Sequence, residues 1–131
     1  MTSRADAIQR VIQAYLDLPD TPEEASHRDF KIVSQLIDSG IEIDHILHAI
    51  KLGFVRRWAR DHSLGHLEAI HSFAYFRTVL NGLTKADFDT FYVSYVAYKY
   101  SRIHPDPVAW YKAQLKKFAG PSPDATENLS K

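Results

Sequence analysis

The segment from Ile41 to Arg60, IEIDHILHAIKLGFVRRWAR, constrains the fold of this chain more than any other. Its large apolar residues recur at steps of three and four, which is the spacing of one face of an α-helix. These residues are Ile43, Ile46, Leu47, Ile50, Phe54 and Trp58. The stretch ends in Arg56, Arg57 and Arg60, with no acid in residues 51–60. The pattern therefore predicts a core-forming helix with a cationic end.

Similar periodicity predicts further helices, and no strand or hairpin pattern is present. Ser26 followed by Asp29, and Thr84 followed by Asp87, are typical of helix N-termini, and Gly40 suits the residue after a helix. The predicted helices cover about 3–17, 26–40, 43–60, 66–82, 85–102 and 107–118. We therefore predict an all-α fold, a single compact bundle of five to six helices over residues 1–118. Residues 119–131 are short of large apolar side chains, which predicts a flexible, disordered tail.

Two helical regions are unusually rich in apolar or aromatic residues. The predicted helix at 66–82 is apolar on most of its circumference, which is typical of a central helix. Five of the seven tyrosines lie between Tyr92 and Tyr111, interleaved with lysine and arginine. Rings beside cations occur in single-stranded nucleic-acid sites. The helical spacing of Phe88, Phe91, Tyr92 and Tyr95 nevertheless favours packing in the core.

Composition excludes several kinds of chemistry. The chain has no cysteine, which excludes disulfides, thiolate metal sites and thiol nucleophiles. It shows no nucleophile elbow, phosphate-binding loop or dinucleotide fingerprint, so we predict that it is not an enzyme and needs no cofactor. The N-terminus lacks the apolar region of a signal peptide, and no apolar run approaches the roughly 20 residues that span a bilayer. We expect a cytoplasmic bacterial protein without membrane contact.

The seven histidines offer little support for a metal site. His62 and His66 are four residues apart, but Gly65 lies between them and disfavours one continuous helix. His45 and His48 are three apart, and no HExxH or paired Glu-x-x-His motif accompanies them. We therefore predict no metal site.

The formal net charge of zero conceals a segregation of charge along the chain. Residues 1–50 hold four basic and nine acidic residues, whereas residues 51–60 hold four basic residues and no acid. Residues 99–117 hold five basic residues and one acid. Such a distribution can steer an anionic partner even when the sum is zero. It also fits solvated helix faces whose opposite charges meet within the fold.

The arginines that end the 43–60 helix have different predicted roles. On a helical wheel, Arg57 falls inside the apolar arc, where it needs a carboxylate or carbonyl partner. We predict a structural tether to an acid such as Asp87, Asp89 or Glu68, with an anion contact as the alternative. Arg56 and Arg60 fall on the polar side. The candidate nucleic-acid-binding residues are Lys51, Arg56, Arg60, Lys112, Lys116 and Lys117.

Three short motifs resemble a set of uncharacterised bacterial helical proteins associated with mobile elements and plasmids. The motifs are LPDTP at 18–22, Gly40-Ile41 followed by Arg56-Arg57 at the end of the next helix, and SFAYF at 72–76. The family has no assigned activity, so the resemblance implies a context and no reaction. ILHAI at 46–50, followed by Tyr75, is also similar to the helical domains of DnaD-type primosome proteins.

Two functions follow as predictions. The first is a non-enzymatic accessory binding module of a DNA-replication or mobile-element system, with weak nucleic-acid contact through the basic helix end. The second is a module that homodimerises or docks a partner protein and binds no nucleic acid.

Overall fold

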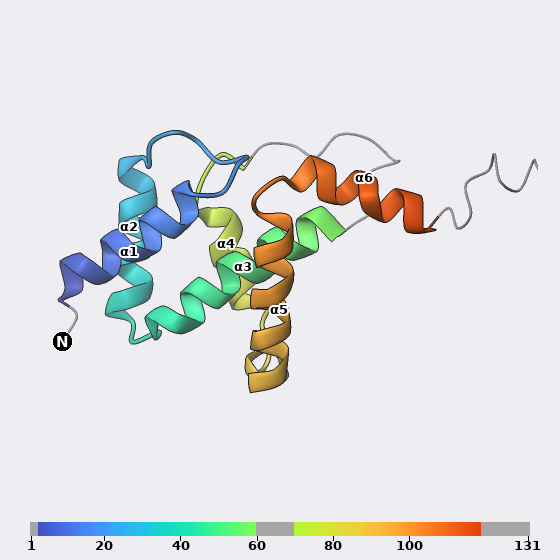
Figure 1. Cartoon of the computed structure of the whole chain (residues 1–131). Coiled ribbons are helices and arrows are strands. Elements are labelled where there is room, and N and C mark those ends of the chain that lie inside the picture. Colours follow the sequence, from blue (N-terminus) through green and yellow to red (C-terminus); the bar gives the residue numbers. More distant parts are fainter. Residues whose placement is uncertain (1–2, 60–69, 119–131) are drawn as a thin grey trace, which may run out of the picture.

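Six α-helices and one short 3-10 helix make up the part of the chain that the computed structural model describes, residues 3–59 and 70–118 (Figure 1). No strand occurs within these residues, and the all-α prediction is confirmed. The elements are α1 (Arg4–Leu16), α2 (His27–Asp38), α3 (Ile43–Ala59), α4 (Ala74–Asn81), η2 (Lys85–Phe88), α5 (Thr90–Ile103) and α6 (Pro107–Phe118). None of the described helices is long and apolar enough to cross a membrane. The predicted tail at 119–131 lies outside the described residues.

The first two helices begin and end at the residues that the sequence pattern predicts. Ser3 caps α1, with its Oγ accepting a hydrogen bond from the amide of Asp6 at 3.1 Å. Ser26 and Asp29 form a reciprocal capping box at the start of α2. Gly40 has a φ of 93° and ends the helix in the left-handed conformation that glycine adopts without strain.

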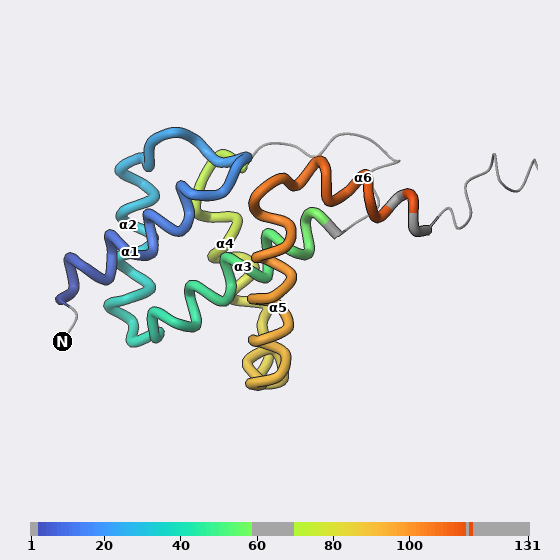
Figure 2. Tube along the Cα trace, in the orientation of Figure 1, coloured from blue at the N-terminus to red at the C-terminus, as the bar shows by residue number. Residues whose placement is uncertain are grey.

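The central helix of the bundle is α3, although the sequence pattern predicts this position for the helix at 66–82. It contacts α1, α4, α5 and α6, and Figure 2 shows it running through the middle of the molecule. Its Ile46, Ile50 and Phe54 are at most 1% exposed. They join side chains of α1, α2 and α4 and the inner face of α5 in one hydrophobic core.

The prediction of a helix at 66–82 is wrong for residues 70–73, the first that the structure describes there, because α4 begins only at Ala74. Ile70 and Phe73 are buried although they lie outside the helix. The amide of Ile70 donates to the carbonyl of Asp20 at 3.0 Å, and the amide of Phe73 donates to the carboxylate of Asp29 at 2.9 Å. Acceptor groups from segments far away in the sequence therefore bond to these two amides, in place of the carbonyls of a preceding helical turn. Residues 66–69 lie outside the described part.

The helix predicted at 85–102 is divided at Asp89. Thr84 and Asp87 lie at a helix N-terminus as predicted and form a capping box, but this box opens the short η2. Asp89 has a ψ of 138°, which ends η2, and its carboxylate caps α5 by accepting from the amide of Phe91 at 3.0 Å. The next helix, α6, begins at Pro107 as predicted.

Candidate interaction surface and groove

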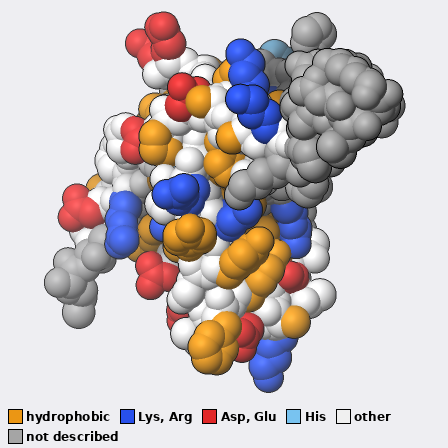
Figure 3. Space-filling model, turned by 45° about the vertical axis from the view of Figure 1, so that its right-hand side comes forward, with side chains coloured by type: hydrophobic (Ala, Val, Ile, Leu, Met, Phe, Trp, Pro, Cys, Tyr) orange, Lys and Arg blue, Asp and Glu red, His pale blue; other side chains and the backbone are white. Residues whose placement is uncertain are grey.

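The side of α5 turned away from the core carries a line of large exposed side chains. Phe91 is 86% exposed, Tyr95 54% and Tyr98 60%. Arg102, also exposed, continues the line, so successive members are four, three and four residues apart. At about 100° per residue these four residues fall within an arc of roughly 60°. We call this line the α5 seam. In Figure 3 hydrophobic side chains gather on the lower part of the molecule, where Figure 1 places α5, with Lys and Arg side chains beside them.

The prediction that the aromatic residues of this region pack in the core is wrong for Phe91 and Tyr95. The core-facing side of α5 is formed instead by Val96 and Ile103, which are 1% and 0% exposed. Tyr92 is partly buried and packs against the core as predicted. The aromatic residues of α5 are thus divided between an inner face and an outer face.

The two ends of the α5 seam carry opposite charge. The exposed Asp89 precedes Phe91, whereas Lys99 and Arg102 lie near the C-terminal end of the helix. This arrangement is stabilised by the helix dipole, which favours acids at the N-terminus and bases at the C-terminus. A partner therefore meets an acidic end, an aromatic middle and a basic end.

Lys99 connects the α5 seam to α6. Its Nζ lies 6.0 Å from the ring centroid of Tyr95 and 5.2 Å from that of Trp110. Lys112 and Lys116 are exposed on α6 and extend the positive charge. Rings beside exposed cations are the elements from which single-stranded nucleic-acid sites are built.

Arg56, a further predicted nucleic-acid contact, lies beside an acid. Its side chain is half exposed, and its guanidinium lies 3.7 Å from the carboxylate of Asp87. The pKa of Asp87 is lowered, chiefly by a hydrogen bond from the Thr84 amide, and the charge of Arg56 contributes to the shift. This acid reduces the positive potential that Arg56 offers to a phosphate. Arg60 and the side chain of Lys117 lie outside the described residues.

Arg57 is buried in α3, at 5% exposed, on the side where the helical wheel places it. Its Nε donates to the carboxylate of Asp20, in the loop after α1, at 2.5 Å. Of the three acids predicted as partners, Asp87 lies beside Arg56 and Asp89 caps α5, and Glu68 lies outside the described residues. The ion pair ties α3 to that loop, which supports a structural role for Arg57.

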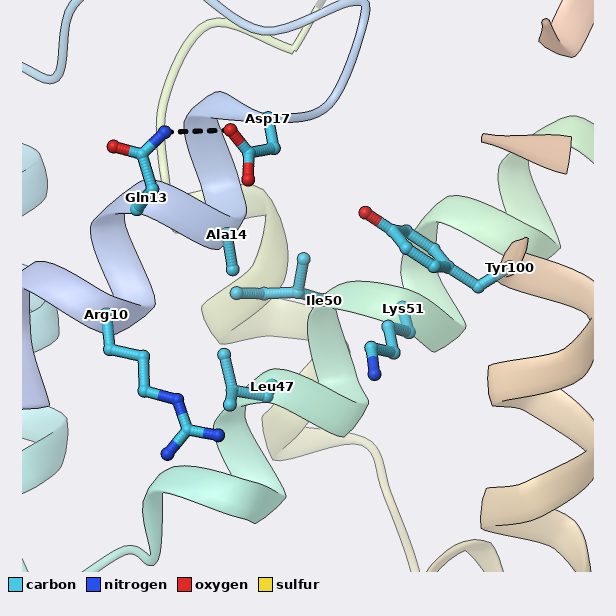
Figure 4. Close-up of a pocket in the computed structure, with 8 residues that line it drawn as sticks. All are labelled: Arg10, Gln13, Ala14, Asp17, Leu47, Ile50, Lys51 and Tyr100. Carbon is cyan, nitrogen blue, oxygen red and sulfur yellow. Dashed lines mark hydrogen bonds between the residues drawn. The ribbon is translucent and has the colours of Figure 1, made fainter. Parts of the chain in front are cut away.

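A groove of about 390 Å³ lies between α1, α3 and α5 (Figure 4). Ala14, Leu47 and Ile50 form its apolar floor. Arg10 of α1 and Lys51 of α3, the latter a predicted nucleic-acid contact, lie on either side of Leu47. The groove therefore combines an apolar surface with two cations.

Tyr100 of α5 forms the third side of this groove. The Nζ of Lys51 lies 5.7 Å from the centroid of its ring. Burial chiefly raises the pKa of Tyr100, and the charge of Asp17 adds to the shift, so the hydroxyl is neutral. The carboxylate of Asp17 accepts a hydrogen bond from Nε2 of Gln13 at 2.7 Å. The groove thus offers a neutral hydroxyl beside the two cations.

His48 is the one buried histidine in the described part of the chain, at 5% exposed. Its Nε2 donates to the backbone carbonyl of Asp87 at 2.7 Å, and burial chiefly lowers its pKa. No group of three His, Cys, Asp or Glu residues suited to a metal ion occurs among the described residues. His62 and His66 lie outside them.

The resemblance to plasmid-associated helical proteins and to DnaD-type domains stays a prediction. Comparison of the chain with known protein families, with characterised proteins and with solved structures found no match.

Proposed function

We propose that this chain is a non-enzymatic protein-interaction module that self-associates through the α5 seam. The observation that carries the proposal is the exposure of Phe91, Tyr95 and Tyr98 on one helix face. Removing apolar area from water is favourable by about 25 cal/mol per Å², so covering three rings supplies a driving force for docking. A contiguous exposed apolar surface is typical of an interaction site.

The spacing of the α5 seam fits a second copy of the same helix. Steps of four, three and four are those of the alternating d and a positions of a two-helix coiled coil. In an antiparallel pair, the two-fold axis lies between Tyr95 and Tyr98. Tyr95 of each copy then faces Tyr98 of the other, and Phe91 faces Arg102.

Charge complementarity favours this antiparallel orientation. Arg102 of one copy then meets the ring of Phe91 and the carboxylate of Asp89 in the other, at both ends of the interface. A parallel pair would instead place Arg102 against Arg102 and Asp89 against Asp89. The seam is therefore complementary to itself, as an interface with two-fold symmetry requires.

The length of the α5 seam limits the affinity. At about 1.5 Å per residue, the distance from Phe91 to Arg102 along the helix is about 17 Å. A helix pair of this length buries less than the roughly 1,200–2,000 Å² of a typical stable interface. We therefore expect a reversible dimer with a dissociation constant in the micromolar range.

Sedimentation velocity over about a hundredfold range of protein concentration tests the proposal. The sedimentation coefficient should rise from the monomer value to the dimer value. Replacing Phe91→Ser and Tyr98→Ser together should keep the protein monomeric throughout. Val108→Ser is the matched control, because Val108 is 53% exposed but lies on α6, outside the seam. A natural sequence that stays monomeric at every concentration would contradict the proposal.

The position of Lys99 between two rings favours a second candidate, weak binding of single-stranded nucleic acid. An accessory role in DNA replication or in a mobile element would use this activity. Fluorescence anisotropy with a labelled oligonucleotide should then show an affinity that falls steeply with salt. Replacing Lys112 and Lys116 by Glu should weaken binding, while Val108→Ser should not. No binding at low salt would rule this candidate out.

A further inference from the structure

We propose that the groove between α1, α3 and α5 binds a small amphipathic organic anion, such as a carboxylate on a short aliphatic chain. Its volume of about 390 Å³ lies within the range of small-ligand sites, roughly 300–1,000 Å³. Tyr100, which lines the groove, is about 180° around α5 from Phe91. The groove and the α5 seam are therefore separate surfaces, and this site does not depend on self-association.

The floor of the groove fits an alkyl chain. Ala14 and Leu47 are partly exposed there, and Ile50 beneath them is 1% exposed. Figure 4 shows the three side chains meeting between α1 and α3. Because none of them is polar, a chain that covers this floor gains apolar burial without desolvating a side-chain donor or acceptor.

The two cations beside the floor fit an anionic head group. No Asp or Glu in the described part of the chain lies within salt-bridge distance of Arg10 or Lys51. By contrast, Arg4 on the same helix as Arg10 is paired with Asp38 at 2.7 Å. Arg10 and Lys51 can therefore both form charge-assisted hydrogen bonds to a ligand.

The orientation of the ligand follows from the position of the acid that lines the groove. Asp17 lies with Gln13 at the end of the groove away from Arg10 and Leu47 (Figure 4), and the Gln13 amide donates to its carboxylate. Asp17 repels an anion from that end. We therefore place the anionic group between Arg10 and Lys51, with the chain over the floor.

Hexanoate is a suitable probe, because it has both a carboxylate and an alkyl chain. Acetate, which has the charge without the long chain, and 1-hexanol, which has the chain without the charge, are the comparison ligands. In an NMR titration we expect saturable shifts of the backbone amides of Ala14, Leu47 and Lys51. Hexanoate should bind at least about tenfold more tightly than either analogue. Equal binding of 1-hexanol, or no saturable shift with hexanoate at these amides, would overturn the proposal.

Arg10→Gln combined with Lys51→Gln should weaken hexanoate binding by about tenfold. Arg28→Gln with Lys31→Gln is the matched control, since both residues are exposed on α2 outside the groove. The amide spectrum itself reports whether each variant is folded. Unchanged affinity in a folded groove variant would overturn the proposal. All titrations are done in the Phe91→Ser/Tyr98→Ser background, so that failure of the seam proposal leaves this result unaffected.

Discussion

The carboxylate of Asp29 accepts a hydrogen bond from the backbone amide of Phe73, 44 residues further along the chain, at 2.9 Å. Its other oxygen accepts from the amide of Ser26, also at 2.9 Å, and completes the capping box of α2. Asp29 is 1% exposed. One buried side chain thus starts α2 and positions the segment that leads into α4.

Asp29→Ala should lower the free energy of unfolding by about 2–4 kcal/mol, because it removes a helix cap and leaves a buried amide without its acceptor. Urea denaturation followed by circular dichroism measures the change. Asp44→Ala, at an exposed acid in the first turn of α3, is the control and should change the free energy by less than about 1 kcal/mol. Similar losses in both variants would contradict the role of Asp29.

Tyr15→Phe should leave the protein as stable as before or more stable, by about 0–1 kcal/mol. Tyr15 is 0% exposed, and its hydroxyl has no hydrogen-bond partner among the described residues. Its ring packs edge-on against Phe73 and Phe76, with centroids 5.4 Å and 5.9 Å away, and phenylalanine keeps both contacts. Thermal denaturation measures the effect, and a loss above about 1 kcal/mol would show that the hydroxyl is bonded.

Gly53→Ala should be destabilising by about 1–3 kcal/mol, although alanine is the better helix former. A methyl group at this position would lie 3.0 Å from Cε1 of Phe76, so this buried ring would have to shift by a few tenths of an ångström within the closely packed core. Gly82→Ala is the matched control, because the nearest heavy atom to its added methyl is 3.6 Å away. Urea denaturation should separate the two variants, and a stabilised Gly53→Ala protein would contradict the close packing.

His48 should make stability decrease in mildly acidic solution. Burial chiefly lowers its pKa below the usual value of about 6.5, with His45 and Lys51 contributing and Asp87 opposing the shift. The unfolded chain therefore takes up the proton first. The contribution of neutral His48 to the free energy of unfolding should be fully present above about pH 6.5. It should be lost progressively as the pH drops below this value. Urea denaturation between about pH 7 and pH 5 should show this slope, and His48→Gln should reduce it. Equal slopes in both proteins would exclude His48 as the cause.

Most helix ends were predictable because they depend on residues that are neighbours in the sequence. The caps at Ser26 and Gly40 and the start of α6 at Pro107 are of this kind. The start of α4 was not predictable, because Ile70 and Phe73 have helical spacing but bond to segments far away in the chain. Long-range hydrogen bonds overrode the local pattern there.

The α5 seam was not predictable for a related reason. Phe91, Tyr95 and Tyr98 have the spacing of a helix face, and so do Val96 and Ile103. Which set is buried depends on where α5 packs against α3, and aromatic residues are often core residues. The groove was not predictable from the sequence either, because its residues come from three helices that are separate in the sequence.

Arg102→Glu should weaken self-association by at least about tenfold, because it places an acid opposite Phe91 and Asp89 of the second copy. Lys112→Glu changes charge equally on the exposed surface of α6, outside the seam, and should leave the dimer unchanged. Sedimentation equilibrium measures both dissociation constants. Equal weakening by the two variants would indicate a general effect of charge and contradict the antiparallel pairing. Weakening by Arg102→Glu alone would support it, because only this pairing brings Arg102 close to an acid and a ring.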